Sequence, residues 1–375
     1  MKILSLFANI GVAEAYLERL GFDVVVANEF DSKRAKLYQE IYPSTHMICG
    51  DIRQPEVINQ IISEGKEIGI DILMATPPCQ GMSTAGKQDK FDKRNNLFLY
   101  AIDVIKEVKP KYFFFENVPA FISTYIIYNS KEHLIPDVIQ NELGDLYDIS
   151  YQIINTKDYE VPQMRERVIF LATRKDVRKK WVMPLKSDTV VTMEDAIGWI
   201  PTIDPFVKDL KYDEFIKLFP HYEERKKKAL SISKWNYPPS HVYRNVLAMQ
   251  YTPTGCTAFD NEFYKPLKKD GTLVKGFKNT YKRQNWNTPA YTIAMDNIQI
   301  SSQNNVHPGR FIKQDEYGNK IYSDPRALTL FELMLLMSIP SDWPLPTNSN
   351  PNFVRKVLGE GIPSLLIKKI FSELI

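Results

Sequence analysis

Two consecutive prolines and a cysteine follow a short apolar run after only two intervening residues, and this junction constrains the fold more than any other segment. The run, residues 70–74, reads Ile-Asp-Ile-Leu-Met and has the length of a buried β-strand. Proline cannot donate to a β-ladder, so Pro77 and Pro78 end the strand and turn the chain out of the sheet. Open α/β sheets bind their ligands at this end of the strands, which makes Cys79 a candidate nucleophile. The alternative is that Cys79 is a small buried hydrophobic side chain, as lone cysteines more often are.

Residues 1–52 repeat a pattern of strand, turn and helix. We predict strands at residues 2–7 and 22–27, with a helix over residues 12–20 between them. Glu29 stands at the end of the second strand, where Rossmann-like folds use an acid to bind ribose hydroxyls. Asp51 follows a third strand and could accept a hydrogen bond from an adenine amino group. Either acid alone is more often a helix cap, but two at successive strand ends favour a site for an adenosine-containing ligand.

A carboxylate with catalytic potential follows a later strand. Residues 111–115 read Lys-Tyr-Phe-Phe-Phe, another buried strand, and Glu116 comes directly after them. In a doubly wound sheet this strand end faces the same cleft as Cys79. A thiolate and a carboxyl group in one pocket can attack an electron-poor carbon with acid assistance. Residues 81–96 are polar and basic, which is typical either of a mobile loop that closes over an anionic substrate or of a solvated connection.

Four sequence elements, in this order, closely resemble those of the C5-cytosine DNA methyltransferases. They are Pro78-Cys79-Gln80, Glu116-Asn117-Val118, Gln163-Met164-Arg165-Glu166-Arg167, and Arg326-Ala327-Leu328-Thr329 with Glu332. The resemblance covers residues 1–175 and 281–375 and leaves the middle of the chain unmatched. It implies an α/β fold with a doubly wound, mostly parallel sheet of the Rossmann-like, S-adenosylmethionine-dependent methyltransferase type. A smaller mixed target-recognition domain is expected beside it.

The resemblance also implies a chemical mechanism. The Cys79 thiolate would add to C6 of cytosine, so that C5 can attack the methyl group of S-adenosylmethionine. Glu116 matches the carboxyl group that contacts N3 and the exocyclic amine while negative charge builds on the ring. Arg165 and Arg167 match residues around the base, and Arg167 is the expected donor to O2. A base stacked in a duplex is out of reach, so the target cytosine would be flipped out.

By the same resemblance, S-adenosylmethionine would lie along the turn after the first strand and against the ends of the next strands. The residues expected to contact it are Phe7, Ala8, Ile10, Gly11, Glu29, Phe30, Asp51, Ile52, Pro78 and Leu97. The chain departs from the family pattern at several positions. Ser5 stands where the family has an acid, and Asn9 and Val12 stand where it has glycines. Glu360 stands where the family has an asparagine.

The unmatched middle, roughly residues 175–280, is the segment with which a member of this family would read a DNA sequence. Residues 262–283 carry seven basic and two acidic residues, interleaved with aromatic residues. Clustered Lys and Arg with glycines suit a loop that follows phosphates, and a solvated surface hairpin is the alternative. The residues expected to contact double-stranded DNA, here and in the loop after Cys79, are Gln80, Ser83, Lys87, Arg94, Lys275, Lys278 and Arg283.

The length of 375 residues and an apolar content of 44% favour two domains. We predict a catalytic and cofactor-binding domain at residues 1–175, a target-recognition domain at 176–350, and a C-terminal helix at 351–375 that returns to the first domain. Three scattered cysteines and five histidines provide neither a disulfide framework nor metal-ligand spacing. No apolar run is long enough to cross a membrane, and the N-terminus does not resemble a signal peptide. We therefore expect a monomer in the cytoplasm of a bacterial or archaeal cell.

These observations predict a DNA (cytosine-5-)-methyltransferase that acts as the modification partner of a restriction endonuclease. One alternative is methylation of cytosine in RNA, such as tRNA, and the large middle segment argues against it. Another is a DNA-binding family member without catalytic activity, but such a protein usually loses Cys79 or Glu116, and both are present. A Rossmann-type oxidoreductase is disfavoured because the Gly-x-Gly-x-x-Gly pattern is missing.

Overall fold

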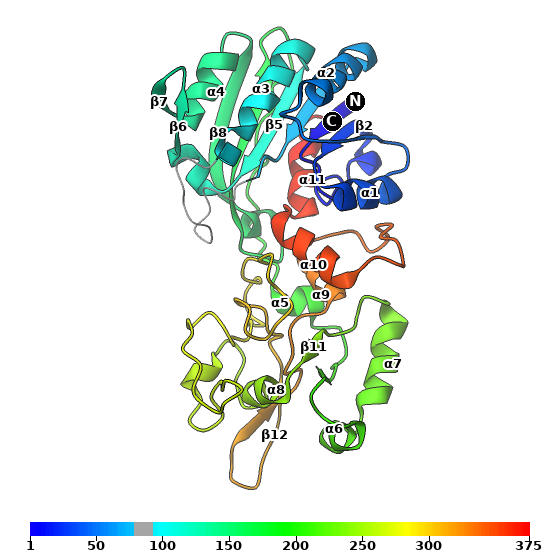
Figure 1. Cartoon of the computed structure of the whole chain (residues 1–375), viewed down its shortest axis with the longest axis vertical. Coiled ribbons are helices and arrows are strands. Elements are labelled where there is room, and N and C mark those ends of the chain that lie inside the picture. The colour runs from blue at the N-terminus through cyan, green and yellow to red at the C-terminus, as the bar shows by residue number, and fades with distance from the viewer. Residues whose placement is uncertain (79–92) are drawn as a thin grey trace.

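The computed structural model describes residues 1–78 and 93–375, which form a larger sheet lobe and a smaller lobe below it (Figure 1). The sheet has the strand order β3-β2-β1-β4-β5-β9-β8. Strands β1 to β5 are parallel, and β9 is antiparallel to both β5 and β8. This confirms the predicted α/β fold with a mostly parallel sheet. The strands are β1 (Lys2–Leu6), β2 (Asp23–Glu29), β3 (His46–Cys49), β4 (Ile72–Ala75), β5 (Tyr112–Asn117), β8 (Tyr147–Asn155) and β9 (Glu166–Arg174).

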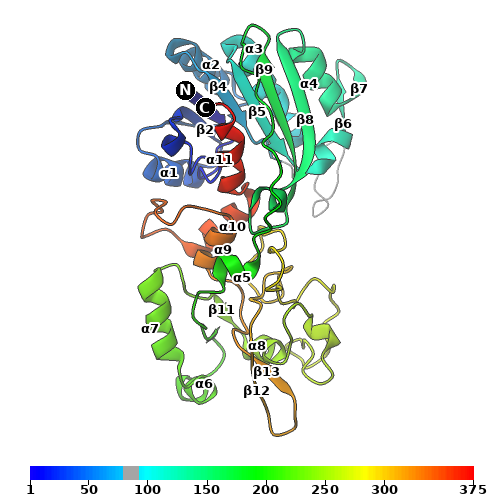
Figure 2. The ribbon, with the colours of Figure 1, turned by 180° about the vertical axis from the view of Figure 1, so that it is seen from behind.

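Helices cover both faces of the sheet, because successive side chains of a buried strand point to opposite faces. Phe113 and Phe115 of β5 belong to a core that includes α2, α3 and α4. Phe114 between them packs with Trp181 and with Phe371 of α11. Figure 2 shows α11 against this second face. The helices of the lobe are α1 (Ser32–Ile41), α2 (Pro55–Ile68), α3 (Leu97–Val108), α4 (Ile135–Leu143) and α11 (Ser364–Ser372).

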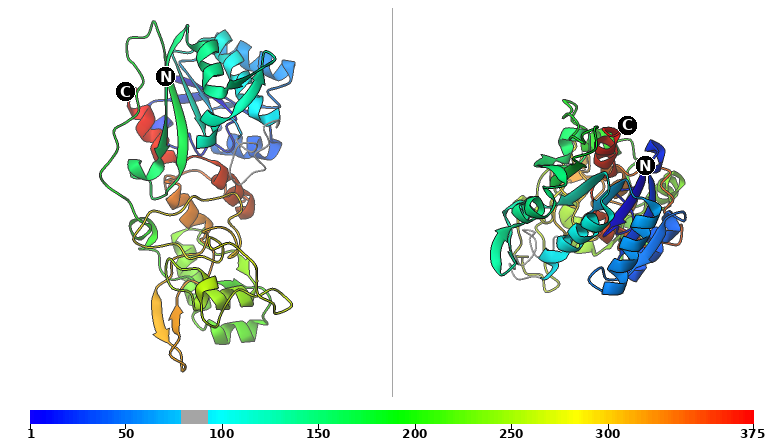
Figure 3. Two further views of the ribbon diagram at one scale, coloured as in Figure 1. Left: turned by 90° about the vertical axis from the view of Figure 1, so that its left-hand side faces the viewer. Right: turned by 90° about the horizontal axis from the view of Figure 1, so that it is seen from above.

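Two predicted helices differ in the structure. Residues 12–20 form successive turns, of which only η1 (Glu18–Leu20) is a regular 3₁₀ helix, because backbone N–H groups here bond three residues back. The C-terminal run is divided at Gly361 and Pro363 into α10 (Pro351–Glu360) and α11, since proline cannot donate the next helical hydrogen bond. The N- and C-terminal ends lie beside each other in the sheet lobe (Figure 3).

The smaller lobe has its own apolar core, in which Phe215, Tyr222, Val246, Met249 and Val306 pack together. A separate core between the lobes joins α5, α9 and α10 to the turn after β1 and to α1. The remaining elements are β6 (Tyr125–Tyr128), β7 (Lys131–Leu134), α5 (Met193–Ile197), β10 (Phe206–Val207), α6 (Tyr212–Leu218), α7 (Tyr222–Ile232), β11 (Ser240–His241), α8 (Tyr243–Gln250), β12 (Phe311–Gln314), β13 (Lys320–Tyr322) and α9 (Leu330–Leu336), with the short 3₁₀ helices η2 (Lys93–Asn96), η3 (Pro119–Ser123), η4 (Thr156–Tyr159) and η5 (Ala258–Asp260).

Candidate active site

A cavity of about 1020 Å³ opens between the two lobes, at the carboxyl ends of the parallel strands. Parallel strands bring these ends to one edge of the sheet, so residues that follow β1, β2, β3, β4 and β5 all line the cavity. The smaller lobe contributes Thr280 and residues 292–296 and 301–303, none of which the sequence analysis singled out as cavity residues. Residues 359–362, at the C-terminal end of α10 and directly after it, form a further wall. Among the predicted cofactor residues, the cavity is lined by Phe7, Ala8, Glu29, Phe30, Asp51, Ile52, Pro78 and Leu97.

The turn after β1 faces the cavity, but two residues predicted to contact the cofactor do not line it. Ile10 is fully buried in the core between the lobes. Gly11 has a φ of 77°, and a Cβ atom there would lie 2.2 Å from the ring of Tyr42, so this close approach requires glycine. Asn9 lines the cavity instead, and its Oδ1 is buried without a hydrogen-bond partner among the described residues. Ile10 and Gly11 therefore lie behind the cavity wall, and their contact with the cofactor stays a prediction.

The two acids predicted at strand ends both line the cavity, and both have partners. Glu29 accepts hydrogen bonds from the backbone N–H groups of Asn9, at 2.9 Å, and Asp31, at 2.8 Å. Burial raises the pKa of Glu29, and these hydrogen bonds oppose the increase. Asp51 accepts a hydrogen bond from Arg53 Nη2 at 2.5 Å, which lowers the pKa of Asp51. Glu29 therefore holds the turn after β1 in place beside the cavity.

Glu116, at the end of β5, forms an ion pair with Arg167 of the neighbouring strand β9. The distance between Oε1 and Nε is 2.6 Å, and the two side chains are only 10% and 12% exposed. Since Glu116 is paired in register with Ile169, Arg167 is its diagonal neighbour on the same face of the sheet. Both residues line the cavity. The antiparallel pairing of β5 and β9 thus brings two of the predicted catalytic residues together.

The bend that precedes Cys79 is attached to the same strand end. Asn117 is buried and donates a hydrogen bond from Nδ2 to the carbonyl oxygen of Pro77 at 3.0 Å. The sequence analysis gave Asn117 no role of its own, although its place directly after Glu116 was a signal. Cys79 lies outside the described residues, so its position beside Glu116 stays a prediction.

Arg165 occupies a different environment from Arg167. Its side chain is 2% exposed, and its two terminal nitrogens donate to the carbonyl oxygens of Ile293 and Gly359, each at 2.9 Å. These acceptors belong to the smaller lobe and to the end of α10. The resemblance predicted a residue that acts on the base, whereas the structure places the Arg165 guanidinium between two backbone segments at the cavity wall. These contacts hold the two backbone segments at the cavity wall, and a role for Arg165 at the base stays a prediction.

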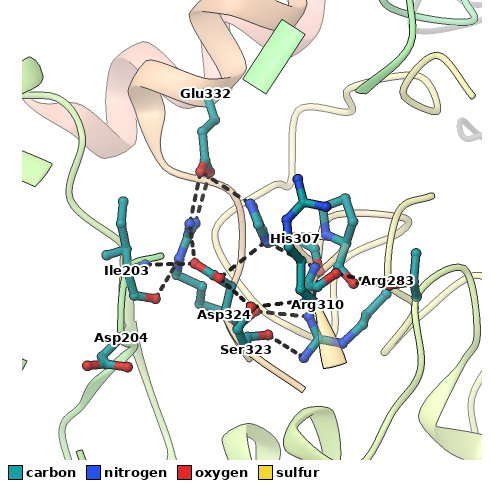
Figure 4. A network of polar contacts seen from close by, with 12 residues as sticks. Ile203, Asp204, Arg283, His307, Arg310, Ser323, Asp324 and Glu332 are labelled. Atoms are coloured by element: carbon teal, nitrogen blue, oxygen red, sulfur yellow. Dashed lines mark hydrogen bonds and ion pairs between the residues drawn. The ribbon is translucent and has the colours of Figure 1, made fainter. Parts of the chain in front are cut away.

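Arg283 was predicted to contact DNA, and the structure shows that this prediction was wrong. The side chain is fully buried and donates to the carbonyl oxygens of His307, Asp324, Met249 and Ser323 at 2.8–3.1 Å. Figure 4 shows Arg283 facing inward, toward His307 and Ser323. Burial lowers the pKa of Arg283 to about 9. Sequence alone could not distinguish this arginine from the exposed basic residues that precede it.

Arg283 belongs to a buried polar network that holds the smaller lobe against α9 (Figure 4). Arg326 pairs with Asp324 and with Glu332, in each case at 2.9 Å, and all three residues are almost inaccessible to solvent. Burial alone would raise the pKa of Asp324, but His307 and Arg326 hold the pKa at about 2. The late Arg-x-Leu-Thr-x-x-Glu element is thus an internal structural connection in this chain.

The other residues predicted to contact DNA divide into two groups. Lys275 and Lys278 are exposed on the smaller lobe, beside Phe277, which is 79% exposed. The chain then runs directly to Thr280 at the cavity. Gln80, Ser83 and Lys87 lie outside the described residues, and so does the side chain of Arg94.

The described ranges 1–78 and 93–375 contain neither a metal-ligand cluster nor a candidate membrane-spanning helix. No group of three or more His, Cys, Asp or Glu residues there could hold a metal ion. No helix in these ranges is long and apolar enough to cross a membrane. Cys49 and Cys256 are both free and exposed.

Solved structures of DNA methyltransferases share this fold. A putative DNA modification methyltransferase from an E. coli prophage aligns with a TM-score of 0.65 and 21% identity, covering 100% of this chain and 98% of that one. A mutant DNMT2 from Spodoptera frugiperda aligns with a TM-score of 0.57 and 17% identity, covering 100% and 99% of the two chains. The fold is therefore the α/β fold of the DNA methyltransferases.

Sequence comparisons then specify the family. The model of the C-5 cytosine-specific DNA methylases matches residues 1–375, and the chain belongs to this family. Type II methyltransferase M1.HgaI of Avibacterium volantium is 38% identical over 99% of this chain and 97% of its own length. Type II methyltransferase M.XorII of Xanthomonas oryzae is 27% identical over 99% of this chain and 84% of its own length. The protein is thus a member of the DNA (cytosine-5-)-methyltransferases.

Proposed function

We propose that this enzyme transfers the methyl group of S-adenosylmethionine to C5 of a cytosine that is flipped out of a specific duplex sequence. The proposal rests on one cavity that is lined both by residues assigned to the cofactor and by residues assigned to the target base. Glu29 and Asp51, which are assigned to the nucleoside part of the cofactor, line it, and so does the Glu116–Arg167 pair at the end of β5. The bend before Cys79 is attached to that same strand end through Asn117.

The cavity residues fit S-adenosylmethionine, which would supply an electrophilic methyl group. Carboxylates such as Glu29 and Asp51 accept hydrogen bonds from ribose hydroxyls and an adenine amino group. Phe30 is 70% exposed beside Glu29 and offers a ring against which a purine can stack. The unpartnered Oδ1 of Asn9 provides a further acceptor at the turn after β1. We propose that these residues and the backbone of residues 7–9 hold the cofactor.

The Cys79 thiolate would add to C6 of the target cytosine and would be expelled once C5 has received the methyl group and lost its proton. Glu116 would contact N3 and the exocyclic amine, where a carboxyl group offsets the charge that develops on the ring. Arg167 Nε lies 2.6 Å from Glu116 Oε1. The guanidinium has further N–H groups, which would donate a hydrogen bond to the O2 atom of the cytosine ring. Because a stacked base cannot reach these groups, the cytosine must leave the helix.

The smaller lobe is the proposed reader of the DNA sequence. Lys275 and Lys278 would contact phosphates, together with residues of the loop after Cys79, namely Gln80, Ser83, Lys87 and Arg94. The exposed ring of Phe277 would lie against the duplex between the two lysines. The proposed domains comprise residues 1–175, 176–350 and 351–375. Helix α11, which belongs to the last of them, packs against the sheet of the first domain.

Similarity to type II methyltransferases supports a protective role. Methylation of the recognition sequence would block cleavage by a restriction endonuclease of the same specificity in the cytoplasm of the host. We propose that the methyltransferase acts as a monomer, since one chain contains every group that the reaction requires.

The decisive experiment uses a library of random duplexes in which 5-fluorocytosine replaces cytosine, with S-adenosylmethionine labelled in its methyl group. Fluorine at C5 prevents the final elimination, so the enzyme should remain covalently attached to its target after denaturation. Sequencing of the trapped duplexes would identify the recognition sequence. Cys79→Ser should abolish the adduct, whereas the control Cys49→Ser alters an exposed cysteine outside the cavity and should leave it unchanged.

An adduct on structured RNA but not on DNA would instead indicate an RNA methyltransferase. If neither nucleic acid is trapped while DNA is still bound, the protein is a DNA-binding member without catalytic activity.

A further inference from the structure

An ion pair between Arg34 and Glu360 joins two walls of the cavity. Arg34 lies in the first turn of α1, and Glu360 is the last residue of α10, 326 positions later in the chain. The guanidinium binds the carboxylate in a bidentate manner, with Nη1–Oε2 at 2.6 Å and Nη2–Oε1 at 3.0 Å. The side chains are 21% and 16% exposed, so solvent screens this pair less than it screens a surface pair.

Glu360 occupies a position at which a carboxylate needs a cationic partner. The C-terminal end of a helix carries partial negative charge, which disfavours a further anion there. Arg34 offsets this repulsion. The Arg34 charge also acts on Glu29 at the end of β2, where it opposes the rise in pKa that burial causes. Arg34 therefore pairs with one carboxylate that lines the cavity, Glu360, and acts electrostatically on another, Glu29.

The segment that Glu360 anchors is itself a wall of the cavity. Residues 359–362 all line it. Gly359 accepts a hydrogen bond from Arg165 and packs so closely that a Cβ atom would lie 2.2 Å from the carbonyl oxygen of Ala294. On the far side of the segment, Ser364 Oγ donates to the carbonyl oxygen of Val12 at 2.7 Å. These contacts hold the segment against the loop of the smaller lobe and the turn after β1. The Arg34–Glu360 pair is the polar attachment to α1 described for residues 359–362, next to the apolar core that joins α10 to α1.

We propose that the Arg34–Glu360 pair is a positioning element that sets cofactor affinity by holding the wall at residues 359–362 at a fixed distance from α1. The inference rests on the proposed function, since it identifies the cavity as the S-adenosylmethionine site. With the pair intact, the wall is preorganised and cofactor binding does not have to order it. When one partner is replaced, an uncompensated charge remains on the other wall, and only the apolar core attaches the end of α10 to α1.

The test is a double-mutant cycle read out by cofactor binding. The variants are Glu360→Gln, Arg34→Gln and both together. Isothermal titration with S-adenosylhomocysteine gives the dissociation constant of each. Each single substitution should weaken binding about tenfold, and the double neutral variant should be no weaker than the singles. In steady-state assays the loss should fall on KM for S-adenosylmethionine more than on kcat.

Asp342→Asn provides the matched control. Asp342 pairs with Arg19 across a similar sequence separation, but both side chains are largely exposed and neither lines the cavity. This variant should bind S-adenosylhomocysteine as the wild-type protein does. Unchanged dissociation constants in the Arg34 and Glu360 variants, or effects of the two single substitutions that simply add, would overturn the inference and leave the proposed function standing. A wild-type protein that does not bind S-adenosylhomocysteine would overturn both.

Discussion

The buried carboxyl group of Glu14 makes the stability of the sheet lobe dependent on pH in a predictable direction. Glu14 is 3% exposed and lies beneath the turn after β1. It accepts hydrogen bonds from Ser5 Oγ at 2.5 Å and from the hydroxyl of Tyr38. Burial raises the pKa of Glu14 from 4.5 to about 7, against the opposing effect of these two hydrogen bonds.

The contribution of Glu14 to the free energy of unfolding follows from its pKa values in the folded and the unfolded chain. Below pH 4.5 the carboxyl group is protonated in both the folded and the unfolded chain, so this contribution to stability is fully present. Between pH 4.5 and pH 7 the unfolded chain releases the proton that the folded chain retains, and the contribution is lost. Each tenfold difference in proton affinity corresponds to about 1.4 kcal/mol, so the loss is about 3 kcal/mol. For a chain of this length that unfolds as one unit, this corresponds to about 4 °C in melting temperature.

Glu14→Gln tests this prediction, because glutamine preserves the shape of the side chain and stays neutral at every pH. Melting temperatures of the two proteins, measured from pH 5 to pH 8, should diverge as the pH rises, with the variant becoming relatively more stable by about 4 °C. Glu18→Gln, an exposed position in the same segment, should show no such divergence. A difference between Glu14→Gln and wild type that stays constant with pH would show that Glu14 is already ionised in the folded protein and would refute the reasoning.

Three further predictions concern the active site and the smaller lobe. Glu116→Gln should slow single-turnover methyl transfer by about 10²–10³-fold, because an amide paired with Arg167 cannot offset ring charge in the same way, and near-normal rates would contradict the assigned role. Arg283→Met should lower the free energy of unfolding in urea by about 3 kcal/mol, since buried carbonyl groups lose their donors, whereas unchanged stability would mean that the residue is not part of the core. Replacing Lys275 and Lys278 by Gln should reduce the slope of log Kd for DNA against log salt by about 2, and an unchanged slope would exclude them as phosphate contacts.

Much of the sheet lobe was readable from sequence because its signals are local. The apolar runs that become β4 and β5 are continuous along the chain, and prolines or acids mark where they end. Once the sheet is parallel, Glu29, Asp51 and Glu116 must meet at one edge, which is why their shared cavity could be predicted. The helix expected over residues 12–20 does not form, and the contacts of this segment are not local. Glu14 is buried and accepts hydrogen bonds from Ser5 and Tyr38, and the segment forms turns instead of a helix.

The sequence by itself determined the fold class and the family and supplied the candidate residues of the reaction, because strand patterns and short motifs depend on neighbours within a few positions. Tertiary structure decided what each arginine does. Arg167 faces Glu116, Arg165 holds two backbone segments, Arg283 is buried, and Arg34 joins α1 to α10. A guanidinium group has the same chemistry at every position, so its role depends on the acceptors around it. Those acceptors lie tens to hundreds of residues away, and only the folded chain brings them within hydrogen-bonding distance.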